Sequence, residues 1–143
     1  MSKGTILVTG ANGGLGSAIV QNIISTPDLA SNYAGIYAVR KAATAMTLQG
    51  VLRRAPLDHR HETVEIDLGS LASVRKTAAD INARVAKGDL PKIRALILNA
   101  GYSDYANLVS GADENTSVIN FLVRSLTTEC TSQVMSEDGL EMT

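Results

Sequence analysis

The glycines of residues 9–16, Thr-Gly-Ala-Asn-Gly-Gly-Leu-Gly, have a spacing that suits the binding of phosphate groups. They lie between a short apolar run, Ile6 to Val8, and a helical pattern, where backbone N–H groups and the helix dipole can hold a pyrophosphate. Gly10 would allow a tight turn, Gly14 would let phosphates approach the backbone, and Gly16 would let helix and strand pack closely. The segment predicts a nucleotide-binding loop; the alternative is a glycine-rich turn without a ligand.

A basic pair, Arg40-Lys41, follows the second apolar run and bears on which dinucleotide would bind. At this position an acidic residue binds the ribose 2′-hydroxyl of NAD, whereas a basic one accommodates the 2′-phosphate of NADP. A guanidinium also matches phosphate geometry, so we expect NADP(H). The alternative is that both side chains are merely solvated at a strand end. Asp28 has nearly the spacing of an NAD-type acid, but its Thr-Pro-Asp context predicts a turn residue in the loop before the strand.

Two other features could suggest chemistry. His59 and His61, set among charged neighbours, could suggest a metal, but with no further ligands in view we expect a solvated loop and no metal site. Cys130 is the single cysteine, and no Cys/His constellation surrounds it, so we expect an inert thiol.

The elements that would position these residues alternate along the first hundred positions. Short apolar runs typical of strands buried on both faces of a parallel sheet occur at residues 6–8 and 95–98, and two further strands are predicted at residues 35–39 and 63–66. A first helix is indicated by Leu15, Ile19, Val20, Ile23 and Ile24, a weaker one by residues 42–52, and a third by Leu71, Val74, Ala78, Ile81 and Val85. Thr26-Pro27-Asp28 would end the first helix; Ser70 would begin the third, and Lys87-Gly88 would end it.

The connections between the predicted strands are too long for hairpins, which favours right-handed βαβ crossovers. We therefore expect an α/β fold of the Rossmann type, a doubly wound parallel sheet that is truncated after about four β-α units. After residue 101 the alternation is lost, and one further amphipathic helix is indicated by Val118, Phe121, Leu122 and Leu126.

Three motifs in this order resemble the classical short-chain dehydrogenase/reductase family. Thr-Gly-x-x-x-Gly-x-Gly at residues 9–16 has the family's form of the glycine loop. Asp67-Leu68 resembles the family's Asp that hydrogen-bonds the adenine ring. Asn99-Ala100-Gly101 resembles its Asn-Ala-Gly, which stabilises the sheet and lines the adenosine side of the cofactor. Residues 136–143 resemble the opening of the family's next helix.

The resemblance implies an NADP-binding Rossmann half-domain over residues 1–101, an insert-like segment over 102–135, and the start of the next family helix over 136–143. The implied cofactor-binding residues are Gly10, Asn12, Gly13, Gly14, Leu15, Gly16, Arg40, Lys41, Asp67, Leu68, Asn99, Ala100 and Gly101.

Family members transfer a hydride between NADP(H) and a carbonyl or secondary alcohol, using a Tyr, a Lys, a Ser and an Asn. We expect all four to lie beyond the last matching motif, so we assign no catalytic residue. Tyr37 and Lys41 do spell Tyr-x-x-x-Lys, but they fall on a strand and its exit rather than on a helix. Tyr102 and Tyr105 have no Lys four residues on, so a loop or core role is expected.

Three functions remain open at this point: an NADP-dependent reductase acting on a small-molecule carbonyl or alcohol, a non-catalytic module that binds nucleotide or a partner, and a truncated product without stable function. At about 30 residues per β-α unit, a complete domain would need more than about 200 residues. The usual interface helices would then be missing, although an oligomer is not excluded.

Composition is that of an ordinary globular chain: 45% of the 143 residues are apolar, and the formal net charge is −1. No basic stripe suggests nucleic acid as a partner. The only apolar N-terminal stretch is too short for a signal peptide or membrane anchor, so we expect a cytoplasmic chain.

Residues 109–130 look inserted. Joining Leu108 directly to Thr131 would give a loop of the family's size, followed by residues 136–143 in their family place. We hypothesise a retained intron, which would also explain the early end of the chain.

Overall fold

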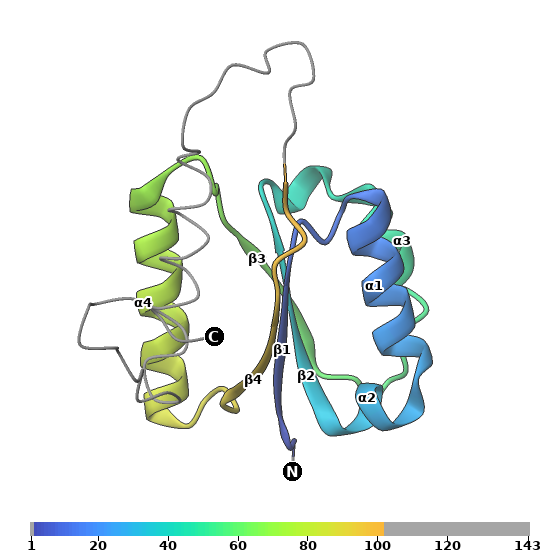
Figure 1. Cartoon of the computed structure of the whole chain (residues 1–143). Coiled ribbons are helices and arrows are strands. Elements are labelled where there is room, and N and C mark those ends of the chain that lie inside the picture. Colours follow the sequence, from blue (N-terminus) through green and yellow to red (C-terminus); the bar gives the residue numbers. More distant parts are fainter. Residues whose placement is uncertain (1, 102–143) are drawn as a thin grey trace, which may run out of the picture.

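The computed structural model describes residues 2–101, which form a four-stranded parallel sheet with helices on both faces (Figure 1). The strand order is β3-β2-β1-β4, so the first two strands lie in the centre. The strands are β1 (Gly4–Thr9), β2 (Tyr33–Val39), β3 (His61–Glu65) and β4 (Ile93–Ile97). All neighbouring strands in this sheet run parallel, which confirms the predicted Rossmann-type α/β class.

Helices α1 (Gly14–Ser25), α2 (Pro27–Asn32) and α3 (Met46–Leu52) lie on one face of the sheet, and α4 (Leu71–Lys87) covers the other (Figure 1). Each face has its own apolar core. The first holds, among others, Ile6, Val8, Val20, Tyr37 and Leu48; the second holds Leu7, Ile36, Val74, Ala78 and Ile81. Ile6, Leu7 and Val8 of β1 enter alternate cores because side chains alternate across a strand, which explains why this run is continuously apolar.

The ends of α4 follow the predicted signals. The Ser70 hydroxyl accepts a hydrogen bond from the Ser73 amide at 3.3 Å, and Gly88 ends the helix with a φ of +81°. A hydroxyl N-cap and a left-handed glycine satisfy backbone groups that a helix leaves unpaired at its two ends.

Several predicted details of the elements were wrong. Leu15 does not belong to the buried stripe of α1, because 71% of the residue's surface is exposed. Residues 42–52 form two pieces, a 3-10 turn η1 (Ala42–Thr44) and α3, rather than one helix. Asp28 lies in the first turn of α2 instead of a loop, because Pro27 starts a new helix immediately after α1 ends.

His59 is the clearest correction, because it is buried, with 4% of its surface exposed, rather than solvated. Its Nδ1 lies 2.9 Å from the carbonyl oxygen of Ala30, and its Nε2 lies 2.9 Å from the hydroxyl of the fully buried Tyr37. Since a carbonyl only accepts, Nδ1 carries the proton and Nε2 accepts from Tyr37. The imidazole thus gives a buried phenol the partner that it needs.

This neutral imidazole predicts an acid-sensitive fold. Burial lowers the pKa of His59 from its ordinary value of 6.5, and the nearby His61 adds to this, while the bond to Ala30 and the charge of Asp58 oppose it. The unfolded chain then takes up a proton that the folded chain resists, so stability is intact above pH 6.5 and falls as the pH drops below it. The slope for one proton is at most about 1.4 kcal/mol per pH unit.

Urea unfolding of wild type, His59→Gln and His61→Gln at pH 7.5 and 5.5 measures this loss of stability. His59→Gln should lose the part of the pH dependence that His59 causes, whereas His61→Gln should keep most of that pH dependence. Equal pH dependence in wild type and His59→Gln would contradict it.

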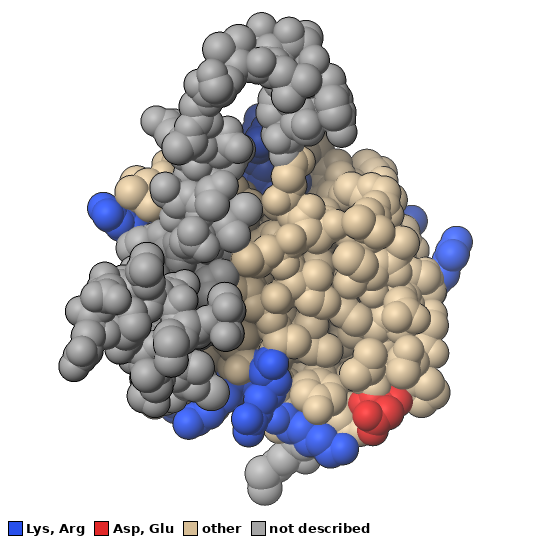
Figure 2. All heavy atoms as spheres, in the orientation of Figure 1, with Lys and Arg blue, Asp and Glu red and all other residues tan. Residues whose placement is uncertain are grey.

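Charged side chains are sparse over one part of this surface. Figure 2 shows no charged side chain over α1, while Lys and Arg gather at the lower edge of the described surface, at the end of the sheet away from the glycine loop. None of the helices in residues 2–101 has the length and hydropathy needed to span a membrane.

The predictions that fall on residues 102–143 lie outside the described residues. These concern Tyr102, Tyr105, Cys130, the helix around Phe121, the proposed insertion, and the segments 102–135 and 136–143.

Candidate functional site

Two cavities that share lining residues lie where the chain leaves the carboxyl ends of the strands. The larger, of about 910 Å³, is bounded by the glycine loop, the end of β2 and the segments that follow β3 and β4. The smaller, of about 240 Å³, lies between the glycine loop and η1. Both are lined by Gly10, Gly13, Val39 and Arg40. This edge of an open parallel sheet is where α/β proteins bind ligands.

At three positions of the loop, glycine is required or allowed for a different geometric reason. Gly10 has a φ of +63°, and a Cβ there would stand 2.9 Å from the Cα of Ala100. A Cβ on Gly16 would overlap the carbonyl oxygen of Gly10, so this glycine lets α1 begin close to β1. A Cβ on Gly14, which lines the larger cavity, would meet no atom of the described part of the chain within 4 Å. The open space beside Gly14 is therefore part of the cavity rather than of the core.

The N-terminus of α1 faces the same space. The first α-helical hydrogen bond runs from the Ser17 amide to the Gly13 carbonyl at 2.8 Å, so the amides of Gly14, Leu15 and Gly16 have no acceptor within the helix. The N-cap residue, Gly13, has no side chain that could cap them, and the first turn holds no acidic residue. An anion here would meet unpaired N–H donors and the positive end of the helix dipole.

Asn99 joins the loop to the end of β4. Its side-chain amide donates to the carbonyl oxygens of Thr9 and Gly10 at 3.2 and 3.3 Å. The backbone amides of Asn99 and Ala100 both donate to the hydroxyl of Thr9 at 3.1 Å. Thr9 is buried, so these bonds hold the two strand ends at a fixed separation and keep the cavity open between them.

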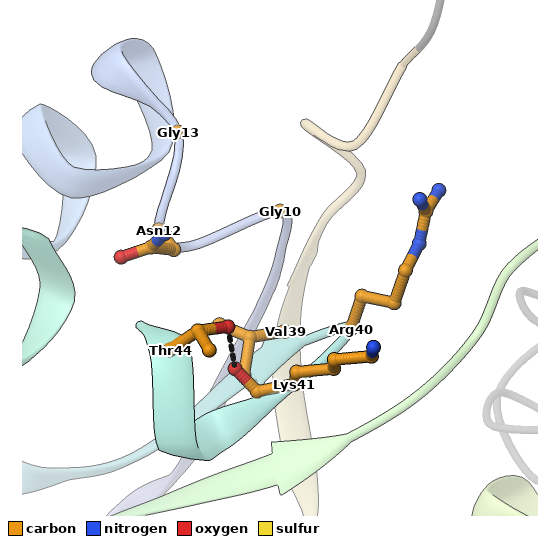
Figure 3. Close-up of a pocket in the computed structure, with 7 residues that line it drawn as sticks. All are labelled: Gly10, Asn12, Gly13, Val39, Arg40, Lys41 and Thr44. Carbon is orange, nitrogen blue, oxygen red and sulfur yellow. Dashed lines mark hydrogen bonds between the residues drawn. The ribbon is translucent and has the colours of Figure 1, made fainter. Parts of the chain in front are cut away.

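Asn12 is engaged in a contact that its place in the motif does not suggest. Its side-chain oxygen accepts a hydrogen bond from the Leu48 amide at 3.1 Å, and in Figure 3 it points away from Arg40 and Lys41. Ala45, at the N-cap of α3, has no side chain that could cap the helix. Asn12 thus caps α3 from a distance and fixes the glycine loop against it.

The basic pair lies at the end of β2. Figure 3 shows the side chains of Arg40 and Lys41 extending to the same side from the rim of the smaller cavity, with Thr44 beside them. The Thr44 hydroxyl donates to the Lys41 carbonyl at 3.4 Å. Arg40 Nε lies 3.8 Å from Asp67 Oδ1, and both side chains are more than half exposed. An exposed pair of this kind contributes little to stability, so Arg40 is available to a ligand.

The structure brings most of the predicted residues together. The larger cavity is lined by Gly10, Gly13, Gly14, Leu15, Gly16, Arg40, Leu68, Asn99, Ala100 and Gly101, and the smaller one additionally by Asn12 and Lys41. Asp67 lines neither; its Oδ1 accepts from the Gly69 amide at 3.0 Å.

Other residues at these walls were not predicted. Ala38, Val39, Ile66 and Gly69 line the larger cavity, and Thr44 lines the smaller. The signal for the apolar ones was available, since Val39 and Ile66 end predicted strands that point at this edge. Thr44 had no such signal.

Tyr37 carries no catalytic geometry despite its Tyr-x-x-x-Lys spacing. It has no exposed surface, it is bonded to His59, and burial raises the pKa of its phenol. Within residues 2–101, no three His, Cys, Asp or Glu side chains gather in a way that could hold a metal ion.

Fold and cavity together define a Rossmann-type nucleotide-binding domain, and comparisons with known proteins narrow this class. No family model matches the chain. Over 104 residues, 71% of the chain, it is 56% identical to the short-chain dehydrogenase iccH of Talaromyces variabilis. Its fold matches an NADPH-bound carbonyl reductase from chicken fatty liver, with a TM-score of 0.64 and 24% identity over 90% of the chain. It also matches a metagenomic short-chain oxidoreductase in complex with NADP, with a TM-score of 0.62 and 19% identity over 90% of the chain.

The chain belongs to the short-chain dehydrogenase/reductase family, as its three motifs, its sheet order and its identity to the Talaromyces protein agree. It spans only part of these relatives: 28% of the Talaromyces protein, and 48% and 57% of the two solved structures.

Proposed function

We propose that this chain supplies the NADP(H)-binding part of a reductase that transfers a hydride between NADP(H) and a carbonyl or secondary alcohol. The observation that carries the proposal is the meeting of the glycine loop and the Arg40-Lys41 pair around the smaller cavity. The glycine loop suits a pyrophosphate, and the Arg40-Lys41 pair suits an additional phosphate.

The pyrophosphate would lie at the N-terminus of α1. The open space beside Gly14 and the unpaired amides of Gly14, Leu15 and Gly16 support this assignment. Gly13 lines both cavities, so a dinucleotide held there could reach both of them.

The ribose 2′-phosphate would lie beside Arg40 and Lys41. Both cations line the smaller cavity, and the guanidinium could donate two parallel hydrogen bonds to a phosphate. The chicken and metagenomic proteins that share the fold were solved with NADPH and NADP, which supports the same preference here.

The adenine ring would lie between the ends of β2 and β3. Val39, Ile66 and Leu68 give this part of the larger cavity apolar walls. Asp67 could accept a hydrogen bond from the exocyclic amine, because its carboxylate has two oxygens and Arg40 Nε lies 3.8 Å from Oδ1.

NADPH would bring the hydride, and the described residues would hold and orient the dinucleotide. Tyr37 does not suit the proton transfer, because it has no exposed surface and its hydroxyl is bonded to His59. We therefore propose that the Tyr, Lys, Ser and Asn of the family's chemistry lie outside residues 1–101.

Titration calorimetry of the full chain with two small probes tests the cofactor assignment. The probes are 2′,5′-ADP and 5′-AMP, which share the adenosine and the 5′-phosphate and differ in the 2′-phosphate. We expect 2′,5′-ADP to bind at least about tenfold more tightly, the equivalent of one charge-assisted hydrogen bond. NADPH and NADH should show the same order, and equal affinities in both pairs would contradict the proposal.

A further inference from the structure

The carboxylate of Glu65 holds the turn that follows the basic pair at the wall of the smaller cavity. Oε1 of Glu65 accepts a hydrogen bond from the Ala42 amide at 2.7 Å. Glu65 ends β3, and its backbone carbonyl accepts from Thr77 of α4 at 3.4 Å, so the carboxylate projects from a well-anchored strand end. Ala42 opens η1 and directly follows Lys41.

The rest of the turn depends on this position. The Ala42 carbonyl accepts from the Ala45 amide at 3.1 Å and from the Gln49 side chain at 3.2 Å. The Thr44 hydroxyl reaches back to the Lys41 carbonyl (Figure 3). Only the Glu65 contact ties the N-terminal side of this turn to the sheet edge among the side-chain hydrogen bonds described for residues 2–101. Lys41 and Thr44 line the smaller cavity, so movement of Ala42 would change its wall.

Glu65 also adds a negative charge next to the basic pair, at a distance set by the Ala42 bond. A carboxylate there opposes the field of Arg40 and Lys41, and a second carboxylate, Asp67, lies beside Arg40. Two effects of Glu65 on a bound 2′-phosphate therefore have opposite sign: the hydrogen bond shapes the cavity, and the charge weakens its attraction for a dianion.

We propose that Glu65 is a positioning residue that fixes the Lys41–Thr44 turn and thereby sets the discrimination between NADP(H) and NAD(H). The inference rests on the proposed function. It predicts that the discrimination responds to the hydrogen bond and to the charge separately, although Glu65 is not expected to contact the cofactor.

Two substitutions in the full chain separate these effects. Glu65→Gln keeps an oxygen acceptor for the Ala42 amide but removes the charge, whereas Glu65→Ala removes both. NADPH should bind about fivefold more weakly to Glu65→Ala than to Glu65→Gln, the size of one neutral hydrogen bond, while NADH should bind the two variants within about twofold. Relative to wild type, Glu65→Gln should bind NADPH at least equally well. Asp80→Ala, which removes an exposed carboxylate from α4 on the other face, should leave both affinities unchanged.

Amide hydrogen exchange without cofactor gives an independent readout. Exchange at Ala42 should be faster in Glu65→Ala than in wild type, and near the wild-type rate in Glu65→Gln. A wild-type chain that binds both dinucleotides equally would overturn the proposed function and with it the role of Glu65 in discrimination. A wild-type preference for NADPH that is identical in both Glu65 variants, with unchanged exchange at Ala42, would overturn the Glu65 inference alone.

Discussion

Gly14→Val is expected to abolish NADP(H) binding while leaving the chain folded. Among residues 2–101, no atom lies within 4 Å of a Cβ at this position, so a branched side chain would not disturb the packing of α1. It would instead fill the space of the cavity in front of the helix N-terminus, where the proposed pyrophosphate must approach the backbone. We expect NADPH affinity to fall at least about 100-fold, because the phosphates would lose more than one charge-assisted hydrogen bond.

Two further glycines serve as controls for this substitution. Gly50→Val places the same side chain on α3, again with no atom within 4 Å, and lies at neither cavity, so it should bind NADPH as wild type does. Gly16→Val would drive its Cβ into the carbonyl oxygen of Gly10 and should unfold or strongly destabilise the chain. Calorimetry with NADPH and circular dichroism with thermal melting measure both properties. NADPH affinity retained in a folded Gly14→Val chain would mean that the loop is only a turn.

The central strands and α4 could be predicted from sequence because their signals are local. Every residue of β1 is buried and its centre is the apolar run Ile6 to Val8, while α4 combines helical spacing with a serine cap and a terminal glycine. Helix α2 was not predicted because Pro27 was interpreted only as the end of the first helix, although it is also the first residue of the next one. His59 escaped because its charged sequence neighbours give no sign of Tyr37, its buried partner 22 residues away.

In the candidate site, too, some features could be predicted from sequence and others could not. Motifs that follow three parallel strands had to gather at one edge of the sheet, so Gly14, Arg40 and Asn99 could be predicted to lie near one another. The supporting contacts could not be predicted, because they join residues far apart in sequence. Asn12 reaches Leu48, and Glu65 reaches Ala42, through side chains whose roles depend on the register of helices and strands. Local patterns therefore predicted which residues line the cavities better than they predicted the contacts that hold the cavity walls.

Arg40→Asp is expected to reverse the preference between the two dinucleotides. The guanidinium at the rim of the smaller cavity is the main expected partner of the 2′-phosphate, and a carboxylate in its place would repel that group. The substitution also sets a second carboxylate close to Asp67, which raises the negative potential further. Loss of a charge-assisted hydrogen bond together with this repulsion should weaken NADPH binding about 100-fold. The fold should persist, because the Arg40–Asp67 pair is exposed.

NADH lacks the 2′-phosphate, so its ribose 2′-hydroxyl could donate a hydrogen bond to the new carboxylate, and its affinity should stay constant or rise. Titration of both dinucleotides at two salt concentrations measures the change, since screening should weaken wild-type binding of NADPH more than that of NADH. Arg54→Asp supplies the control, because it makes the same change of charge at an exposed residue that lines neither cavity. If Arg54→Asp reduced NADPH binding as much as Arg40→Asp does, net charge rather than a phosphate contact would govern the affinity. An unchanged ratio of NADPH to NADH affinity in Arg40→Asp would remove Arg40 from the proposed site and leave Lys41 as the remaining cation at that cavity among residues 2–101.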